Sequence, residues 1–194
     1  MKATILISCL LAGGGLLMKN SPVDKTTYIT TAPTKTTIAR KKAMSKPYGQ
    51  IRLVVDKSKY ELSVYDAQGW YATYPVVFGS SSLDDKKMEG DRLTPEGSFR
   101  VVNKRYHEKW DRYMGLDYPT RESLDKFNRR KQMGLIPAWA RPGGGVGIHG
   151  CWPKEDFVVD RYNNWTNGCI ALKRADIEDL YSYIPVGTPI YIQR

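Results

Sequence analysis

The sequence has few of the residues that metal proteins and disulfide-rich proteins depend on, with two histidines and three cysteines among 194 residues. His149, Cys151 and Cys169 could together ligate zinc, but three ligands without a partner pattern make a poor site. We therefore expect no metal and no organic cofactor. In an oxidising compartment Cys151 and Cys169 could pair as a disulfide; otherwise one is a reactive thiol and the other a bystander.

Acidic residues are also scarce relative to basic ones, at 20 against 30, which gives a formal net charge of +10 and a pI near 9.5. Nucleic acid, an anionic membrane surface and a carboxylate-rich polymer would all attract such a chain. Charge alone does not choose among these three partners.

The apolar run at the N-terminus, MKATILISCLLAGGGLLMKN, is short for a full membrane span. Its basic start, apolar middle and polar end predict an export signal or N-terminal anchor over residues 1–20, with a buried helix as the alternative. The residues Leu6–Ile7–Ser8–Cys9 also resemble a bacterial lipoprotein processing site, although the residues after Cys9 stay apolar. Export argues against a nucleic-acid partner. We expect a protein of the periplasm or cell envelope, with a membrane tether through the N-terminus if Cys9 is lipidated.

Residues 21–47 are rich in Thr, Lys, Pro and Ala without a sustained apolar period, which predicts a flexible linker. The remaining residues, 48–194, contain alternating apolar stretches separated by turn residues, and no internal repeat. The expected strands are 51–56, 60–66, 71–79, 94–102, 146–150 and the C-terminal end of the chain. This pattern predicts a mainly β fold, a curved β-sandwich-like arrangement of mixed sheets with a few short helices.

Two segments show helical spacing of apolar residues instead. In 119–134, Leu124 and Phe127 are spaced for one helix face, Thr120 or Ser123 could cap the start, and Gly134 could end the helix. Near the C-terminus, apolar residues recur at i, i+3, i+4 and i+7, namely Ile177, Leu180, Tyr181 and Ile184. We expect a surface helix in the first segment and an amphipathic helix in the second.

Cys169 stands between Gly168 and a short apolar run, and His149 precedes it on an apolar strand flanked by glycines. A cysteine that transfers acyl groups needs a thiolate, a base, and hydrogen-bond donors for the oxyanion. A free thiol with a pKa of about 8.5 is mostly protonated at neutral pH, and a nearby imidazole makes the thiolate accessible. The alternative is that Cys169 is a small apolar filler and His149 a structural residue.

The strings IHG (148–150) and WTNGCIAL (165–172) resemble the signature of the L,D-transpeptidase catalytic domain, also called the YkuD domain. TPEG (94–97) and PVGTPIYI (185–192) resemble two further elements of that family, so the resemblance covers 48–194. It implies that Cys169 is the nucleophile and His149 its base, oriented by a backbone carbonyl. The implied oxyanion donors are backbone groups around Asn167, Gly168, Cys169 and Gly150.

The sequence departs from the family pattern at two positions. Asn167 stands where a histidine is frequent, and Ala171 stands where an arginine or asparagine is frequent. The missing arginine would reach a substrate carboxylate, so another residue must do so, and Arg141, Lys173 and Arg174 are candidates. The substrate-binding residues that we expect are Thr166, Trp165, Arg141 and Tyr118. The alanine resembles a branch with both murein cross-linking and lipoprotein-link-cleaving enzymes.

The resemblance implies a cysteine acyl-transferase that acts on peptidoglycan stem peptides through a thioester acyl-enzyme. An amine acceptor from a second stem would give a cross-link, and a lysine of an envelope lipoprotein would give an anchor. With water as acceptor the enzyme would be a hydrolase that trims the stem peptide or releases a wall-linked lipoprotein. We expect the excursion 104–140 to be a lid over the site, with His107 on the surface.

Overall fold

The computed structural model describes residues 38–41 and 46–194. The predicted export signal, with the tether at Cys9, lies outside the described residues, as does most of the predicted linker. Arg40 and Lys41, within the predicted linker range, form the short strand β1 (Arg40–Lys41), which pairs with Thr73 and Ala72. Within the described ranges, no helix has the length and apolar character needed to cross a membrane.

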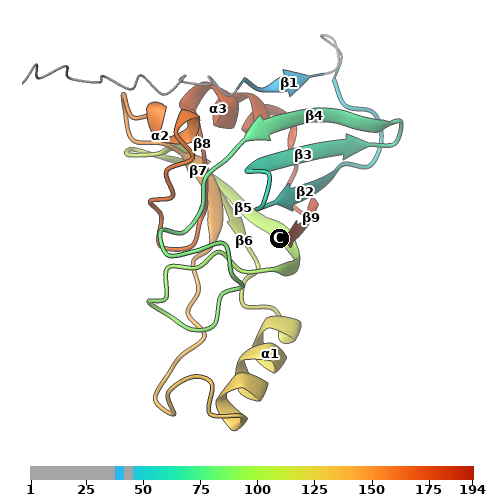
Figure 1. The fold of residues 1–194 in the computed structure, drawn as a ribbon. Coiled ribbons are helices and arrows are strands. Elements are labelled where there is room, and N and C mark those ends of the chain that lie inside the picture. Colours follow the sequence, from blue (N-terminus) through green and yellow to red (C-terminus); the bar gives the residue numbers. More distant parts are fainter. Residues whose placement is uncertain (1–37, 42–45) are drawn as a thin grey trace, which may run out of the picture. The chain divides into compact units, whose positions relative to one another are not determined.

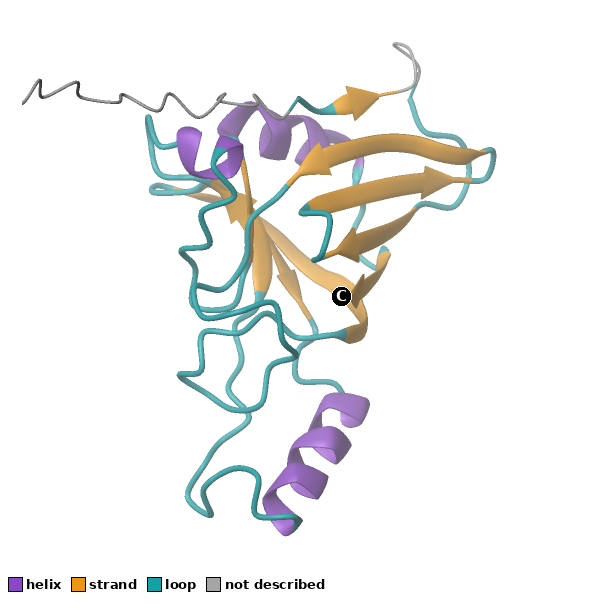
Figure 2. Ribbon diagram, viewed as in Figure 1, coloured by secondary structure: helices purple, strands orange, loops and turns teal. Residues whose placement is uncertain are grey.

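One mixed sheet of nine strands forms the centre of the described region (Figures 1 and 2). Its order is β1-β4-β3-β2-β9-β5-β6-β7-β8, and the pairs β2/β9 and β7/β8 are parallel whereas the others are antiparallel. Besides β1, the strands are β2 (Arg52–Asp56), β3 (Glu61–Asp66), β4 (Gly69–Pro75), β5 (Gly97–His107), β6 (Asp111–Leu116), β7 (Gly147–Gly150), β8 (Ile170–Leu172) and β9 (Pro189–Gln193). The predicted mainly β class with mixed strands is confirmed.

Strands β2, β3 and β4 correspond to the first three expected strands and form an antiparallel meander. Period-two alternation puts Leu53 and Val55 of β2 and Leu62 and Val64 of β3 into the core, each at most 1% exposed. Burial of apolar side chains on one face fixes the register of these strands, since a slip by one residue would turn every one of them toward solvent.

The long strand β5 joins the two halves of the sheet. Its first residues, Gly97 to Arg100, pair with β9, and the residues from Val101 onward pair with β6, with a register shift between Val101 and Asn103. A bulge of this kind bends a strand and increases its twist. The change of partner and the bulge together give the sheet the expected curvature.

Strand β6 corrects one expectation, because residues 104–140 were predicted to form an excursion. Residues 104–107 complete β5 and 111–116 form β6, in the middle of the sheet. The sequence of β6 lacks alternation because Tyr113, Met114 and Leu116 are all buried. A strand that is covered on both faces gives no period of two to read.

The described helices are α1 (Arg121–Gln132), α2 (Phe157–Asp160) and α3 (Arg174–Tyr183). The Thr120 hydroxyl accepts a hydrogen bond from the Ser123 amide and caps α1, and Gly134, just beyond its end, adopts a φ of +68°. Both predicted ends of α1 are therefore confirmed. Helix α3 packs against β6 and β7 and buries Ile177, Leu180 and Ile184 as predicted. No pattern in the sequence predicted the single turn of α2.

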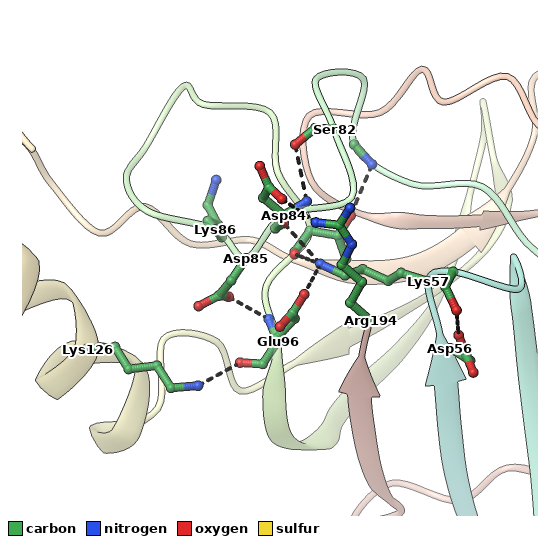
Figure 3. A network of polar contacts seen from close by, with 12 residues as sticks. Asp56, Lys57, Ser82, Asp84, Asp85, Lys86, Glu96, Lys126 and Arg194 are labelled. Atoms are coloured by element: carbon green, nitrogen blue, oxygen red, sulfur yellow. Dashed lines mark hydrogen bonds and ion pairs between the residues drawn. The ribbon is translucent and has the colours of Figure 1, made fainter. Parts of the chain in front are cut away.

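A buried lysine, Lys57, anchors the loop that connects β4 to β5 (Figure 3). Its side chain is fully buried, and its Nζ donates to the carbonyls of Asp84 (3.0 Å) and Thr94 (3.1 Å) and pairs with Glu96 (2.7 Å). The Glu96 amide in turn donates to the Asp85 carboxylate at 2.8 Å. A buried ammonium needs this full set of partners to offset its desolvation. The network holds the two ends of the 84–96 segment together beside the site described next.

Candidate active site

Cys169 lines a pocket of about 410 Å³ at the N-terminal ends of β7 and β8. Three segments form its walls: the loop 86–92, the glycine-rich segment 143–146 that leads into β7, and residues 167–169. The full lining is Lys86, Glu89, Gly90, Arg92, Gly143, Gly144, Gly145, Val146, Asn167, Gly168 and Cys169. The nucleophile predicted from the sequence is therefore reachable from a cavity instead of being sealed in the core.

The Cys169 thiol is a free, half-buried thiol at this pocket. Its Sγ donates to the Gly145 carbonyl at 3.6 Å, and the Tyr113 hydroxyl donates to the same carbonyl at 3.1 Å. Burial raises the pKa of the thiol, while a hydrogen bond from the Gly147 backbone and the charge of Lys86 oppose that rise. The ground state at neutral pH is therefore the thiol, and a base must take its proton when it attacks.

His149 is a neutral base held in one tautomer. Its side chain is 1% exposed, and burial lowers its pKa to about 4. The ring packs face to face with Trp110 (centroids 4.5 Å apart) and edge to face with Trp165 (5.6 Å). Its Nδ1 lies 2.9 Å from the Gly150 carbonyl, and since a carbonyl only accepts, Nδ1 carries the proton. The lone pair is then on Nε2.

The strand register brings Cys169 and His149 to the same face of the sheet. In the parallel pair β7/β8, Ile148 is opposite Ile170 and His149 is opposite Ala171, so one further step puts Cys169 opposite Gly147. Side chains alternate along a strand, and positions 147 and 149 therefore face the same way as 169 and 171. On ordinary strand spacings, His149 is about 7 Å further along and one strand, about 5 Å, across. Gly147 has no side chain of its own, and the Tyr113 ring lies over it, since a Cβ on Gly147 would be 2.6 Å from Tyr113 Cζ.

Thr166 fixes the turn that carries the nucleophile. Its hydroxyl donates to the Cys169 carbonyl at 2.7 Å and accepts from the Gly168 amide at 3.1 Å. Gly168 adopts a φ of +130°, and a Cβ there would lie 2.8 Å from the Leu93 carbonyl oxygen. Only glycine fits this conformation and this approach of two backbones. Thr166, expected to bind substrate, is instead a buried brace for the loop.

Two of the predicted oxyanion donors are already engaged. The Gly168 amide bonds to Thr166, and the Gly150 amide donates to the Trp110 carbonyl at 3.0 Å. Gly150 contributes its carbonyl instead, as the acceptor that orients His149. The expectation for Gly150 is corrected because its N–H is bonded to Trp110, in the turn between β5 and β6, and is unavailable to a ligand.

The other residues expected to bind substrate lie outside the pocket lining. Trp165 packs against His149, and the Tyr118 hydroxyl donates to the Pro142 carbonyl at 3.0 Å. The Arg141 carbonyl accepts from the Glu89 amide at 2.8 Å. Tyr118 and Arg141 thus shape the pocket walls from behind through backbone contacts. The alternative cations are also engaged elsewhere: Lys173 pairs with Asp160 at 2.6 Å, and Arg174 donates to the Cys151 carbonyl.

No residue of 104–140 lines this pocket, so the predicted lid is wrong. Helix α1 lies instead behind the loop 86–92, where Arg130 donates to the Lys86 carbonyl (2.7 Å) and pairs with Asp85 (2.6 Å). Cys151 is fully buried as a free thiol, and burial raises its pKa to about 12. This is the environment of an unreactive bystander.

The loop 86–92 could not be recognised as part of the site from the sequence. It brings Lys86 and Arg92 to the pocket, together with Glu89. The sequence showed only a polar stretch there, without period or motif, and nothing in it indicated that these charges would meet a cysteine some eighty residues later in the chain.

Burial of a neutral His149 predicts a pH-dependent stability. The pKa falls from 6.5 in the unfolded chain to about 4 in the folded one, so between these values the unfolded chain binds a proton that the folded chain does not. The free energy of unfolding should therefore drop by about 3 kcal/mol from this residue as pH falls from 6.5 to 4. Urea unfolding across this range should show the drop in the wild type and in His107→Gln, but not in His149→Gln. Parallel curves for the wild type and His149→Gln would contradict the prediction.

The fold and the site together define a mainly β domain with a pocket-lining cysteine on the same sheet face as a neutral histidine. Residues 50–192 match the L,D-transpeptidase catalytic domain, YkuD. This match extends over most of the chain, and the chain belongs to that family. Among curated protein sequences, none matches.

Several solved structures have a similar fold. The helical cell shape determining protein Pgp2 from Campylobacter jejuni has a TM-score of 0.53 and 20% identity, over 82% of this chain and 51% of that one. Bd1075 from Bdellovibrio bacteriovorus has a TM-score of 0.51 and 20% identity, over 83% and 52%. The Ldtfm–avibactam carbamoyl enzyme has a TM-score of 0.51 and 17% identity, over 76% and 50%. The chain thus spans about half the length of these proteins.

Proposed function

We propose that this chain is a cysteine acyl-transferase that acts on peptidoglycan stem peptides through a thioester on Cys169. The observation that carries the proposal is the placement of Cys169 at a pocket and on the same sheet face as a neutral, carbonyl-oriented His149. Family membership supports the substrate class. A substrate in the wall places the site of action outside the cytoplasm.

The reaction follows from the protonation states of the two side chains. The Cys169 thiol attacks the carbonyl carbon of the donor, and its proton passes to Nε2 of His149. The C–N bond of the tetrahedral intermediate then breaks, and the leaving amine takes that proton from the imidazole. The thioester that results is attacked by the acceptor, which gives its proton to His149. When the new acyl bond forms, the sulfur leaves and recovers the proton.

The oxyanion of the tetrahedral intermediate needs donors on the loop 167–169. With the Gly168 amide bonded to Thr166, we assign this role to the backbone amides of Asn167 and Cys169. Thr166 then acts by holding the turn in shape. Such positioned backbone donors cost no reorganisation as the charge develops.

The acceptor decides between a transferase and a hydrolase. The product profile of muropeptides incubated with the protein tests this directly. New dimers bridged between two diamino acids would support transpeptidation, as the proposal expects. Shortened monomers without dimers would show that water is the acceptor, and release of a wall-linked lipoprotein would place the chain in the link-cleaving branch. Unchanged muropeptides would contradict an enzymatic role.

Arg92 is our candidate for the substrate carboxylate. Ala171 occupies the position of the family's frequent arginine, and Arg92 lines the Cys169 pocket with an exposed side chain, whereas Arg141 does not line it. A charge-assisted hydrogen bond is worth about 1.5–3 kcal/mol. Arg92→Gln should therefore lower kcat/KM about 10- to 100-fold for a donor with a free diamino-acid carboxylate.

The matched control is Arg141→Gln, which should stay within about twofold of the wild type. With a donor whose diamino-acid carboxylate is amidated, the wild type and Arg92→Gln should react at similar rates, because the contact is missing in both. Equal losses on the free and the amidated donor would remove Arg92 from carboxylate recognition.

A further inference from the structure

Lys86 is a largely buried lysine in the wall of the Cys169 pocket. The residue is 6% exposed, and its Nζ pairs with the Asp91 carboxylate at 2.6 Å. The same Nζ lies 3.8 Å from the place that a Cβ on Gly168 would occupy. A buried ammonium therefore sits next to the turn that carries the nucleophile.

The loop holds Lys86 in place from two sides. Besides Lys86, the Asp91 carboxylate accepts hydrogen bonds from the amides of Lys87 (2.6 Å), Met88 (2.9 Å) and Leu93 (3.0 Å). From behind, Arg130 of α1 donates to the Lys86 carbonyl at 2.7 Å. A solvated surface lysine is not held by such a set of contacts. A charge that is this buried costs free energy, which fixed partners must offset.

A positive charge near Cys169 would stabilise negative charge that develops on its sulfur. His149 is neutral at physiological pH, so in the resting site no imidazolium stabilises a thiolate. The charged or titratable groups around the sulfur are Tyr113 and His149 from the sheet and Lys86, Glu89 and Arg92 from the pocket wall. Arg92 and Glu89 are exposed and screened by water. Lys86 is the buried cation of this group.

We propose that Lys86 is a positioning residue for the reaction: its ammonium stabilises negative charge on the Cys169 sulfur and on the adjacent oxyanion, and Asp91 limits the size of this effect. The direction of the electrostatic influence of Lys86 on the thiol agrees with this role. The inference deepens the proposed function and rests on it for the part that Cys169 plays. It adds an electrostatic element from a loop far from Cys169 in sequence.

The test is the apparent pKa of Cys169, measured from the pH dependence of its alkylation by iodoacetamide, with the modified peptide identified by mass spectrometry. Lys86→Met should raise this pKa by about one pH unit, because a partly compensated charge next to the turn that carries the sulfur is removed. Asp91→Asn should lower it, because the ammonium is no longer neutralised. Lys86→Arg should stay near the wild type, and Lys87→Met, at the exposed neighbouring lysine, should leave it unchanged.

The opposite directions of the two expected pKa shifts distinguish an electrostatic role of Lys86 from a purely structural one. A purely structural Lys86–Asp91 pair would make Lys86→Met and Asp91→Asn behave alike, and shifts in the same direction, or none, would overturn the inference. If Lys86→Met does not fold, the pKa of Cys169 in Asp91→Asn still tests the proposal. A lowered pKa supports it, and an unchanged or raised pKa contradicts it.

The alkylation assay does not depend on turnover, so the two proposals fail separately. If no stem peptide acylates the wild type but the variants show the expected pKa shifts, the acyl-transferase proposal is refuted and the role of Lys86 on the thiol stands. Acylation of the wild type with an unmoved thiol pKa in the variants would refute the role of Lys86 alone.

Discussion

Replacing Cys169 with alanine is expected to abolish acylation and turnover, a loss of more than about 10⁴-fold. The reason is chemical: the proposed thioester cannot form without the sulfur. No other described cysteine can substitute, because Cys151 is fully buried and burial raises the pKa of its thiol to about 12. Muropeptide turnover and the mass of the intact protein during incubation with a stem tetrapeptide measure the two losses.

Cys151→Ala is the matched control for this prediction. It removes the other described thiol from the core and should keep both turnover and the acyl adduct, with a stability cost on the order of 1 kcal/mol for the small cavity. If Cys169→Ala retains turnover or an adduct, the assignment of the nucleophile is wrong.

His149→Gln is expected to lower the rate of acylation about 10²- to 10⁴-fold, the usual contribution of a general base. Glutamine can still donate to the Gly150 carbonyl that His149 contacts, but it cannot take a proton from sulfur. The more specific expectation concerns pH. Since burial lowers the pKa of His149 to about 4, the base stays unprotonated down to that pH, and the acid limb of kcat/KM should fall near pH 4 instead of near 6.5.

A pH profile of acylation between about pH 3 and 9, on wild type and His149→Gln, checks this expectation. His107→Gln is the control, since His107 stacks on the far side of Trp110 from His149. An acid limb near 6.5 in the wild type would mean that the imidazole is solvated when it works. A His149→Gln rate equal to the wild type would remove the base from the mechanism.

The regular parts of the fold could be predicted because their apolar residues are buried on one side only. The strands β2–β4 and the helices α1 and α3 could be predicted from the periodic spacing that this burial imposes. Thr120 and Gly134 mark the ends of α1. Strand β6 could not be found by the same rule, since it is buried on both faces. Because β6 was not recognised, residues in the middle of the sheet were assigned to a lid.

The residues of the site also fall into a group that could be predicted from the sequence and a group that could not. Cys169 and His149 belong to short local motifs, and the parallel pairing of β7 with β8 brings these motifs to one face. The charges of the pocket wall, Lys86 and Arg92, come from an irregular loop whose path depends on tertiary anchors such as Lys57. Arg141, Lys173 and Arg174 are closer to the motifs in sequence than Lys86 and Arg92, yet Lys86 and Arg92 are the cations that line the pocket.

The most direct test of the central claim is intact-protein mass spectrometry of the wild type during turnover of a stem tetrapeptide, followed by peptide mapping. The account predicts a transient adduct with the mass of the tripeptide acyl group, located on the Cys169 peptide and removed by hydroxylamine as a thioester is. Turnover without an adduct on Cys169, or an adduct mapped to any other residue, would contradict it.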